Sequence, residues 1–165
     1  MISTPVSRRN FATRFAALLS GIGIAGAMSK PVSAASQKEV QKLGYDGKQA
    51  PKDFITPVIV YDGIIYIAGQ GAHSHDSSDF PMDIETHGKK VMDNVKTVVE
   101  AGGGTMDSIL QLTVYMASIE SYDGFNKVFK TYFPNGGPAR TCIAVAALPG
   151  NSLVEVNCTA AVVRK

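Results

Sequence analysis

The chain of 165 residues lacks tryptophan and has only two cysteines and three histidines. Acidic residues are missing from its first 35 positions, which contain four lysines and arginines. From Ser36 onward there are 12 lysines and arginines against 14 aspartates and glutamates, a formal net charge of −2. The basic balance of the whole chain therefore comes from its N-terminus, and the remainder lacks the basic surface by which proteins bind nucleic acid. We expect no nucleic-acid partner.

The N-terminal region also lacks an apolar run long enough to cross a bilayer. The run at about 15–28 is shorter than the roughly 20 residues that a membrane-spanning helix needs. It follows the paired arginines Arg8 and Arg9 and precedes small residues at 32–35 that suit cleavage. This pattern predicts a twin-arginine signal peptide at residues 1–35 and a periplasmic protein that contacts the membrane only during export. An uncleaved membrane anchor is the alternative.

The spacing of histidines and cysteines that is typical of zinc sites is absent as well. His73 and His75 lie near Asp76 and Asp79 in a polar loop, which permits metal binding, but no third histidine is close in sequence. We interpret this loop as a solvated one.

The length and the lack of internal repeats indicate one domain, at 53–165, preceded by a polar and irregular lead-in at 36–52. Asp62-Gly63 between two β-branched runs predicts a hairpin of strands at 56–61 and 64–68. Apolar periodicity then predicts a helix at 83–101, a strand at 108–117, a helix at 121–133 and two strands at 138–145 and 154–160. The expected fold is α+β, with one sheet and both helices on one of its faces.

The last two strands are predicted to pair as a hairpin around a turn at 149–152. In this register Ile143 points to the core, while Cys142 and Cys158 point to opposite faces and cannot bridge. We therefore expect two free, buried thiols. A turn one residue longer would place both cysteines on one face.

Arg140 and Glu155 interrupt the otherwise uncharged sequence of these strands, and a buried charge is costly unless it is paired or used. The predicted register places both on the face away from the helices, about six residues or ~20 Å apart along the ladder. The other residues of that face are small or polar with few charges, so we expect another subunit to cover it. A site that uses both charges should then lie between subunits.

Each of the charged or polar positions has two interpretations. A guanidinium can bind a carboxylate through two parallel hydrogen bonds, so Arg140 is a candidate anion clamp or else half of an interface ion pair. Glu155 is a candidate base or water-positioning group, or else the partner of a basic residue. Gly69-Gln70-Gly71 either lets a ligand approach the backbone or simply ends a strand. His87 is interpreted as a residue at the edge of the core.

The segment Pro138-Ala139-Arg140-Thr141-Cys142, followed 15 residues after Arg140 by Glu155, resembles the Rid (YjgF/YER057c/UK114-type) family. The resemblance covers about residues 49–164. The supporting segments are Ala68-Gly69-Gln70, Asp93-Asn94-Val95, and Asn126 with Tyr132-Phe133.

This resemblance implies a chorismate-mutase-like fold, a mixed sheet with two helices on one face, assembled as a homotrimer with sites between subunits. It implies hydrolysis of reactive enamines and imines, such as 2-aminoacrylate, to 2-oxo acids and ammonia, without a metal or an organic cofactor. Arg140 would hold the substrate carboxylate, and Glu155 would orient or activate water. The other residues that the resemblance assigns to substrate binding are Cys142, Gly69, Gln70 and Asn126.

The chain departs from the deaminase archetype at two positions. Phe54-Ile55 stands where the archetype has a tyrosine early in the first strand, and Ala68 stands where it has a serine. These changes remove two polar groups but keep the carboxylate clamp, so a non-catalytic binder of small 2-oxo acids is the second hypothesis. RNA cleavage, a third activity of the family, is disfavoured by the acidic domain.

Overall fold

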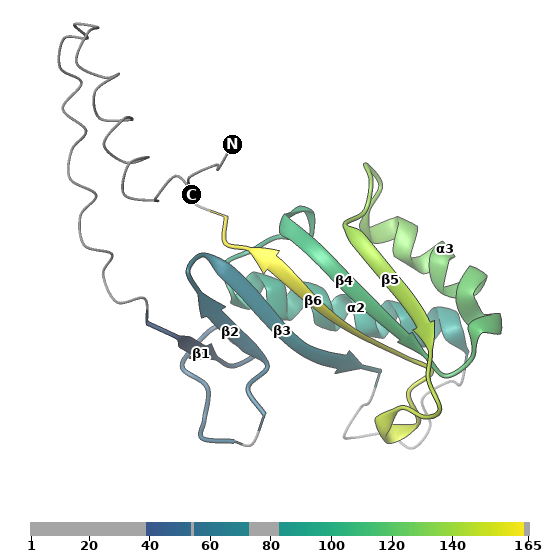
Figure 1. Ribbon diagram of the computed structural model, residues 1–165, viewed down its shortest axis with the longest axis horizontal. Coiled ribbons are helices and arrows are strands. Elements are labelled where there is room, and N and C mark those ends of the chain that lie inside the picture. Colours follow the sequence, from purple (N-terminus) through teal and green to yellow (C-terminus); the bar gives the residue numbers. More distant parts are fainter. Residues whose placement is uncertain (1–38, 54, 73–82, 164–165) are drawn as a thin grey trace, which may run out of the picture. The chain divides into compact units, whose positions relative to one another are not determined.

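The computed structural model describes residues 39–53, 55–72 and 83–163. They form a six-stranded mixed sheet in the order β1-β2-β3-β6-β4-β5, and both helices cover one of its faces (Figure 1). The α+β prediction is therefore confirmed. The elements are β1 (Gln41–Leu43), β2 (Val58–Tyr61), β3 (Ile64–Gly71), α2 (Ile84–Ala101), β4 (Ile109–Met116), α3 (Tyr122–Tyr132), β5 (Ala139–Ala144) and β6 (Val154–Ala161), with three 3₁₀ turns at Met106–Ser108, Ile119–Ser121 and Pro149–Asn151.

Local signals in the sequence account for the first hairpin and for the first helix. Asp62 and Gly63 both have positive φ, 54° and 76°, as a two-residue turn between twisted strands requires. The side chain of Asp83 accepts a hydrogen bond of 2.8 Å from the backbone N–H of Thr86 and so caps α2. Both predicted elements are confirmed.

The core lies between the sheet and the helices, and β6 follows its predicted alternation. Its buried residues are Val154, Val156, Cys158 and Ala160. β4 departs from strict alternation at its start: a register shift between Ile109 and Gln111 buries Ile109 and leaves Leu110 51% exposed. Strict alternation with the buried Leu112, Val114 and Met116 would place Leu110 in the core, and this irregularity explains why it is exposed.

The last two strands are not a hairpin, which corrects the predicted pairing. β4 lies between them, parallel to β5 and antiparallel to β6. The connecting segment crosses the end of β4, because the N–H of Val145 donates to the carbonyl of Met116 and the N–H of Ala117 donates to the carbonyl of Leu153. The turn at 149–152 was therefore wrongly interpreted as a hairpin turn between two strands that pair directly.

This insertion changes the facing of β5. Ile143, expected in the core, is 44% exposed, and Cys142 instead shares the core face with its partner Val114. Both cysteines are free, as expected, with Cys158 buried and Cys142 half-buried. The reason differs from the prediction: both face the helices, but β4 separates them by two strand spacings, about 9.6 Å, which exceeds the Cα separation of a disulfide.

The lead-in segment also differs from its expectation. It contains β1, which pairs with β2 so that Gln41 lies opposite Val60. The expectation of irregular structure at 36–52 was wrong there. The predicted signal peptide and the loop with His73 and His75 lie outside the described residues. Across the part of the chain that is described, no helix has both the length and the apolar character needed to cross a membrane.

Candidate active site

Arg140 lies on the edge strand β5 and points toward α3. It is the register partner of Leu112, a core residue of β4, so it faces the helices. Its Nη2 donates a hydrogen bond of 3.1 Å to Oη of Tyr122, and its Cζ lies 4.5 Å from the centroid of the Phe129 ring. The guanidinium is thus held by an aromatic pair on the helix.

Two other predicted site residues lie near this arginine. Asn126 is half-buried on α3 between Tyr122 and Phe129, and the spacing of three and four residues places these three on one helix face. Cys142 follows Arg140 by two residues on the same face of β5, with Sγ 3.4 Å from Sδ of Met116. We call these residues, Arg140, Cys142, Asn126, Tyr122 and Phe129, the arginine cluster.

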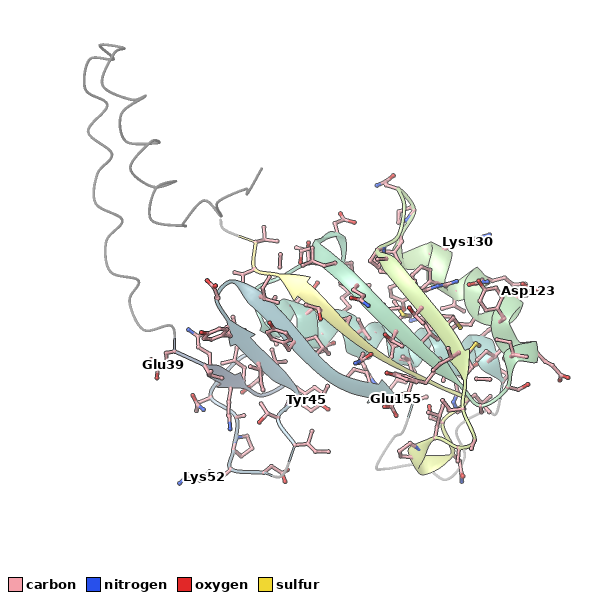
Figure 2. The ribbon with its side chains drawn as sticks, viewed as in Figure 1. Glu39, Tyr45, Lys52, Asp123, Lys130 and Glu155 are labelled. Atoms are coloured by element: carbon pink, nitrogen blue, oxygen red, sulfur yellow. The ribbon has the colours of Figure 1, made fainter. Side chains whose placement is uncertain are left out.

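Glu155 occupies the other face of the sheet, on β6. Its register partners are Tyr115 of β4 and Gly71 of β3. A β-carbon added at Gly69 would lie 2.9 Å from Cδ of Glu155, so the carboxylate occupies space that only a glycine leaves open. Figure 2 shows Glu155 where β3 and β6 run side by side, whereas the labelled residues of α3, Asp123 and Lys130, lie beyond β4 and β5.

An irregularity in β3 produces this space. The register with β6 shifts between Ile67 and Gln70, so Ala68 and Gly69 form a bulge. Gln70 is buried on the helix face of the sheet. Its Nε2 donates a hydrogen bond of 2.9 Å to the carbonyl of Ala68, which stabilises the bulge from the helix side. Gln70 therefore supports the backbone next to Glu155 rather than standing beside the carboxylate.

The end of the bulged strand is fixed by hydrogen bonds from two directions. Asn94 of α2 donates 3.0 Å from Nδ2 to the carbonyl of Gly71, and the N–H of Ala72 donates 2.9 Å to Oγ of Ser152. His87 is buried and accepts a 3.1 Å hydrogen bond at Nδ1 from the N–H of Leu153. This confirms its interpretation as a structural histidine at the edge of the core.

Arg140 and Glu155 therefore lie on opposite faces, and the prediction that they share one face was wrong. Their register partners on β4, Leu112 and Tyr115, are three residues apart, and β4 separates the two strands. Two strand spacings and three residues give a Cα separation of about 14 Å. One small ligand cannot touch both side chains of the same chain, because the sheet lies between them.

Neither Arg140 nor Glu155 has an ion-pair partner among the described residues. Among the described residues, the ion pairs are Lys48–Asp46, Lys89–Asp93, Lys96–Glu100 and Lys127–Glu85. Both charged side chains are half-buried, and half-buried charges are retained at a cost in solvation. Arg140 and Glu155 are therefore available to a ligand or to another subunit.

Sequence reasoning missed the contribution of the aromatic side of α3. Tyr122 and Phe129 belong to the apolar periodicity that predicts the helix at 121–133, and in the structure they also hold Arg140. The signal that could have found them is their spacing on either side of Asn126, itself a predicted site residue. In the described part of the chain no group of three or more His, Cys, Asp and Glu side chains is arranged to hold a metal ion.

These features define a class: a small α+β protein with one mixed sheet, which carries an arginine and a glutamate on opposite faces, neither of them in an ion pair with another described residue. The chain belongs to the Endoribonuclease L-PSP family, whose model matches residues 48–162.

Individual relatives agree with this assignment. Protein HMF1 of Saccharomyces cerevisiae is 32% identical over 100 residues, which cover 61% of this chain and 78% of the yeast protein. A candidate endoribonuclease L-PSP of Entamoeba histolytica is 33% identical, with a TM-score of 0.67 over 74% of this chain and 99% of that one. YyfA of Yersinia pestis, a Rid family protein, is 30% identical, with a TM-score of 0.64 over 76% and 99%. The resemblance to the Rid family is thus confirmed.

Proposed function

We propose that this protein is an exported, periplasmic homotrimer that hydrolyses reactive enamines and imines of 2-amino acids to 2-oxo acids and ammonia. The observation that carries the proposal is that Arg140 and Glu155, on opposite faces of one sheet, form no ion pair with the rest of the described chain. An arginine suits the carboxylate of such a substrate, and a glutamate suits the activation of water. Family membership supports the proposal, although relatives carry names that point to different activities.

In this mechanism Arg140 of one subunit binds the substrate carboxylate, and Glu155 of a neighbouring subunit lies beside the imine carbon. Glu155 accepts a proton from water as the water oxygen bonds to that carbon and the C=N electron pair moves to nitrogen. The same proton then passes from Glu155 to the nitrogen, which restores the carboxylate. The resulting carbinolamine releases ammonia as its hydroxyl becomes the carbonyl of the 2-oxo acid. Water is the only co-reactant, and no metal or organic cofactor is required.

The open face of the sheet supports an assembly of subunits. Across β3, β6, β4 and β5 this face carries one charged side chain, Glu155. Its other members include Tyr66, which is 47% exposed. A second subunit placed on this face would cover the tyrosine and bring its own Arg140 within reach of Glu155.

Imine turnover tests the proposed activity. An amino-acid oxidase generates 2-imino acids in the assay, and semicarbazide traps the fraction that persists. We expect the purified protein to shorten the lifetime of the imine and Glu155→Ala to lose this effect while still binding 2-oxobutanoate. No acceleration by the wild type with several amino acids would refute the hydrolase.

Mixed oligomers test the intersubunit site. Arg140→Ala and Glu155→Ala chains are each inactive alone under the proposal, and they are co-expressed with different tags. In a trimer assembled at random, about a quarter of the sites would combine an intact Arg140 with an intact Glu155, so activity should return. If both residues served a site within one chain, mixing would restore nothing.

A non-catalytic binder of small 2-oxo acids is the second candidate. Two observations favour it: Ile55 is 57% exposed and Ala68 lines the bulge beside Glu155, so both positions at which the archetype is polar are apolar here. Such a binder would hold 2-oxobutanoate without accelerating imine loss. Glu155→Ala would then change affinity alone.

A further inference from the structure

We propose that Tyr122 is a positioning residue, which orients the guanidinium of Arg140 so that one edge of it faces the substrate carboxylate. This inference rests on the proposed function, because it assigns Arg140 a carboxylate ligand. It concerns a side chain that does not itself touch the substrate.

The two aromatic contacts of Arg140 have different effects: Phe129 attracts the guanidinium, and Tyr122 orients it. The Phe129 ring, 4.5 Å from Cζ, attracts the cation, but a ring face allows the guanidinium to rotate over it. The hydrogen bond from Nη2 to Oη of Tyr122, at 3.1 Å, removes this freedom, because it fixes one N–H direction. Within the described residues it is the one hydrogen bond that the guanidinium makes.

A fixed N–H direction matters because a carboxylate is bound through two parallel N–H groups. Nη2 belongs to both edges of the guanidinium that can form such a pair, one with Nε and one with Nη1. Tyr122 occupies one hydrogen of Nη2 and leaves the other, so a single edge remains complete for the ligand. Binding then needs no further ordering of the side chain, which is a gain in affinity by preorganisation.

The position of Tyr122 suits this role. It is the first residue of α3, four residues before Asn126 and seven before Phe129, so all three lie on the helix face toward Arg140. Tyr122 is 38% exposed, so its contact with the arginine lies near the protein surface. The Phe129 ring supports the guanidinium from the core, since Phe129 itself is buried.

The test compares two tyrosines of the same helix. Tyr122→Phe removes the hydroxyl that holds Arg140 and keeps the ring. Tyr132→Phe is the matched control, because the Tyr132 hydroxyl donates a hydrogen bond of 2.6 Å to Asp93 of α2 and not to Arg140. For Tyr122→Phe we expect the Kd for 2-oxobutanoate, measured by calorimetry, and the KM for imines to rise about fivefold. Its kcat should change much less.

The control variant should bind 2-oxobutanoate like the wild type and lose thermal stability instead. Unchanged or tighter binding in Tyr122→Phe, or equal weakening in both variants, would overturn the positioning role. Tighter binding in particular would mean that Tyr122 holds Arg140 away from the ligand.

A second readout keeps this inference separate from the proposed function. Phenylglyoxal modifies accessible arginines, and mass spectrometry follows its rate at Arg140 without any ligand. Faster modification in Tyr122→Phe, but not in Tyr132→Phe, supports the tether even if the wild type hydrolyses no imine. Equal rates in all three proteins would refute the tether even if the hydrolase were established.

Discussion

The two charged groups of the candidate site are held in opposite ways. Arg140 is surrounded by side chains of a neighbouring helix, which supply a ring face and a hydroxyl. Glu155 instead lies in space created by the absence of a side chain at Gly69. The cation is therefore oriented by contacts, whereas the carboxylate is accommodated by the shape of the backbone and keeps its oxygens open. The difference suggests that the arginine is built for binding and the glutamate for chemistry.

Replacing the two charges should separate these roles most strongly. Glu155→Gln keeps the shape but cannot accept a proton, so we expect kcat for imines to fall by about 100-fold or more with little change in the Kd for 2-oxobutanoate. Arg140→Lys keeps the charge but loses the two-pronged edge, so Kd should rise and kcat should change less. Steady-state kinetics and calorimetry on both variants measure this. Loss of ligand binding in Glu155→Gln would contradict the division of roles.

Gly69→Ala should have the next largest effect. The added methyl group would collide with the Glu155 carboxylate, whose flexible end can shift, so we expect about a tenfold lower kcat and little loss of stability. The matched experiment is the same substitution in a Glu155→Ala background. There the collision is absent, and Gly69→Ala should cost almost nothing further. Additive effects would show that Gly69 acts independently of Glu155.

Most of the elements could be predicted because their signals are local. The Asp62-Gly63 turn and the Asp83 cap act within a few residues, and the structure confirms both. The order of the last strands could not be read from such signals, because two apolar strands joined by a turn look alike whether they pair directly or enclose a third strand. One wider signal did exist: a strand, a helix and a strand, here β4, α3 and β5, commonly form a parallel pair.

The wrong pairing of the last two strands also affected the prediction of the site. Arg140, Glu155 and Gly69 were singled out by residue type alone, since a charge or a glycine in an apolar strand needs a reason. Their faces depended on the register, and inserting β4 turned Arg140 toward the helices. The expectation that cooperation would require two subunits gains support, now because of the intervening sheet rather than distance along one hairpin.

A hydrogen bond between Tyr132 and Asp93 joins α3, the helix that carries part of the arginine cluster, to α2. Burial raises the pKa of the Asp93 carboxyl, but hydrogen bonds from Lys89 and Tyr132 outweigh it and hold that pKa below its ordinary value. Stability from this group is thus present above its unfolded pKa of about 3.9 and is lost as the pH falls through the lower folded pKa.

Tyr132→Phe should lower the free energy of unfolding by about 1 kcal/mol at pH 7. Its effect should shrink as the pH falls below about 4 and through the lowered pKa of Asp93, because the folded carboxyl then becomes protonated. Urea unfolding at both pH values measures this, and Tyr45→Phe, at an exposed tyrosine outside the contact, serves as the control. An effect of equal size at both pH values would contradict the role of the ionised carboxylate.

The smallest expected effect concerns the thiols of Cys142 and Cys158, which lie on the two strands that flank β4. Burial raises the pKa of Cys158 to about 12 and also raises that of Cys142, where the positive charge of Arg140 opposes the shift. Neither thiol should form much thiolate at pH 8, so alkylation by iodoacetamide should be slow, with half-buried Cys142 reacting before Cys158. Arg140→Ala removes the opposing charge and should slow Cys142 further, whereas Arg140→Lys should not. Peptide mass spectrometry reports both rates, and faster alkylation of Cys142 in Arg140→Ala would show that Arg140 acts there by covering the thiol rather than by its charge.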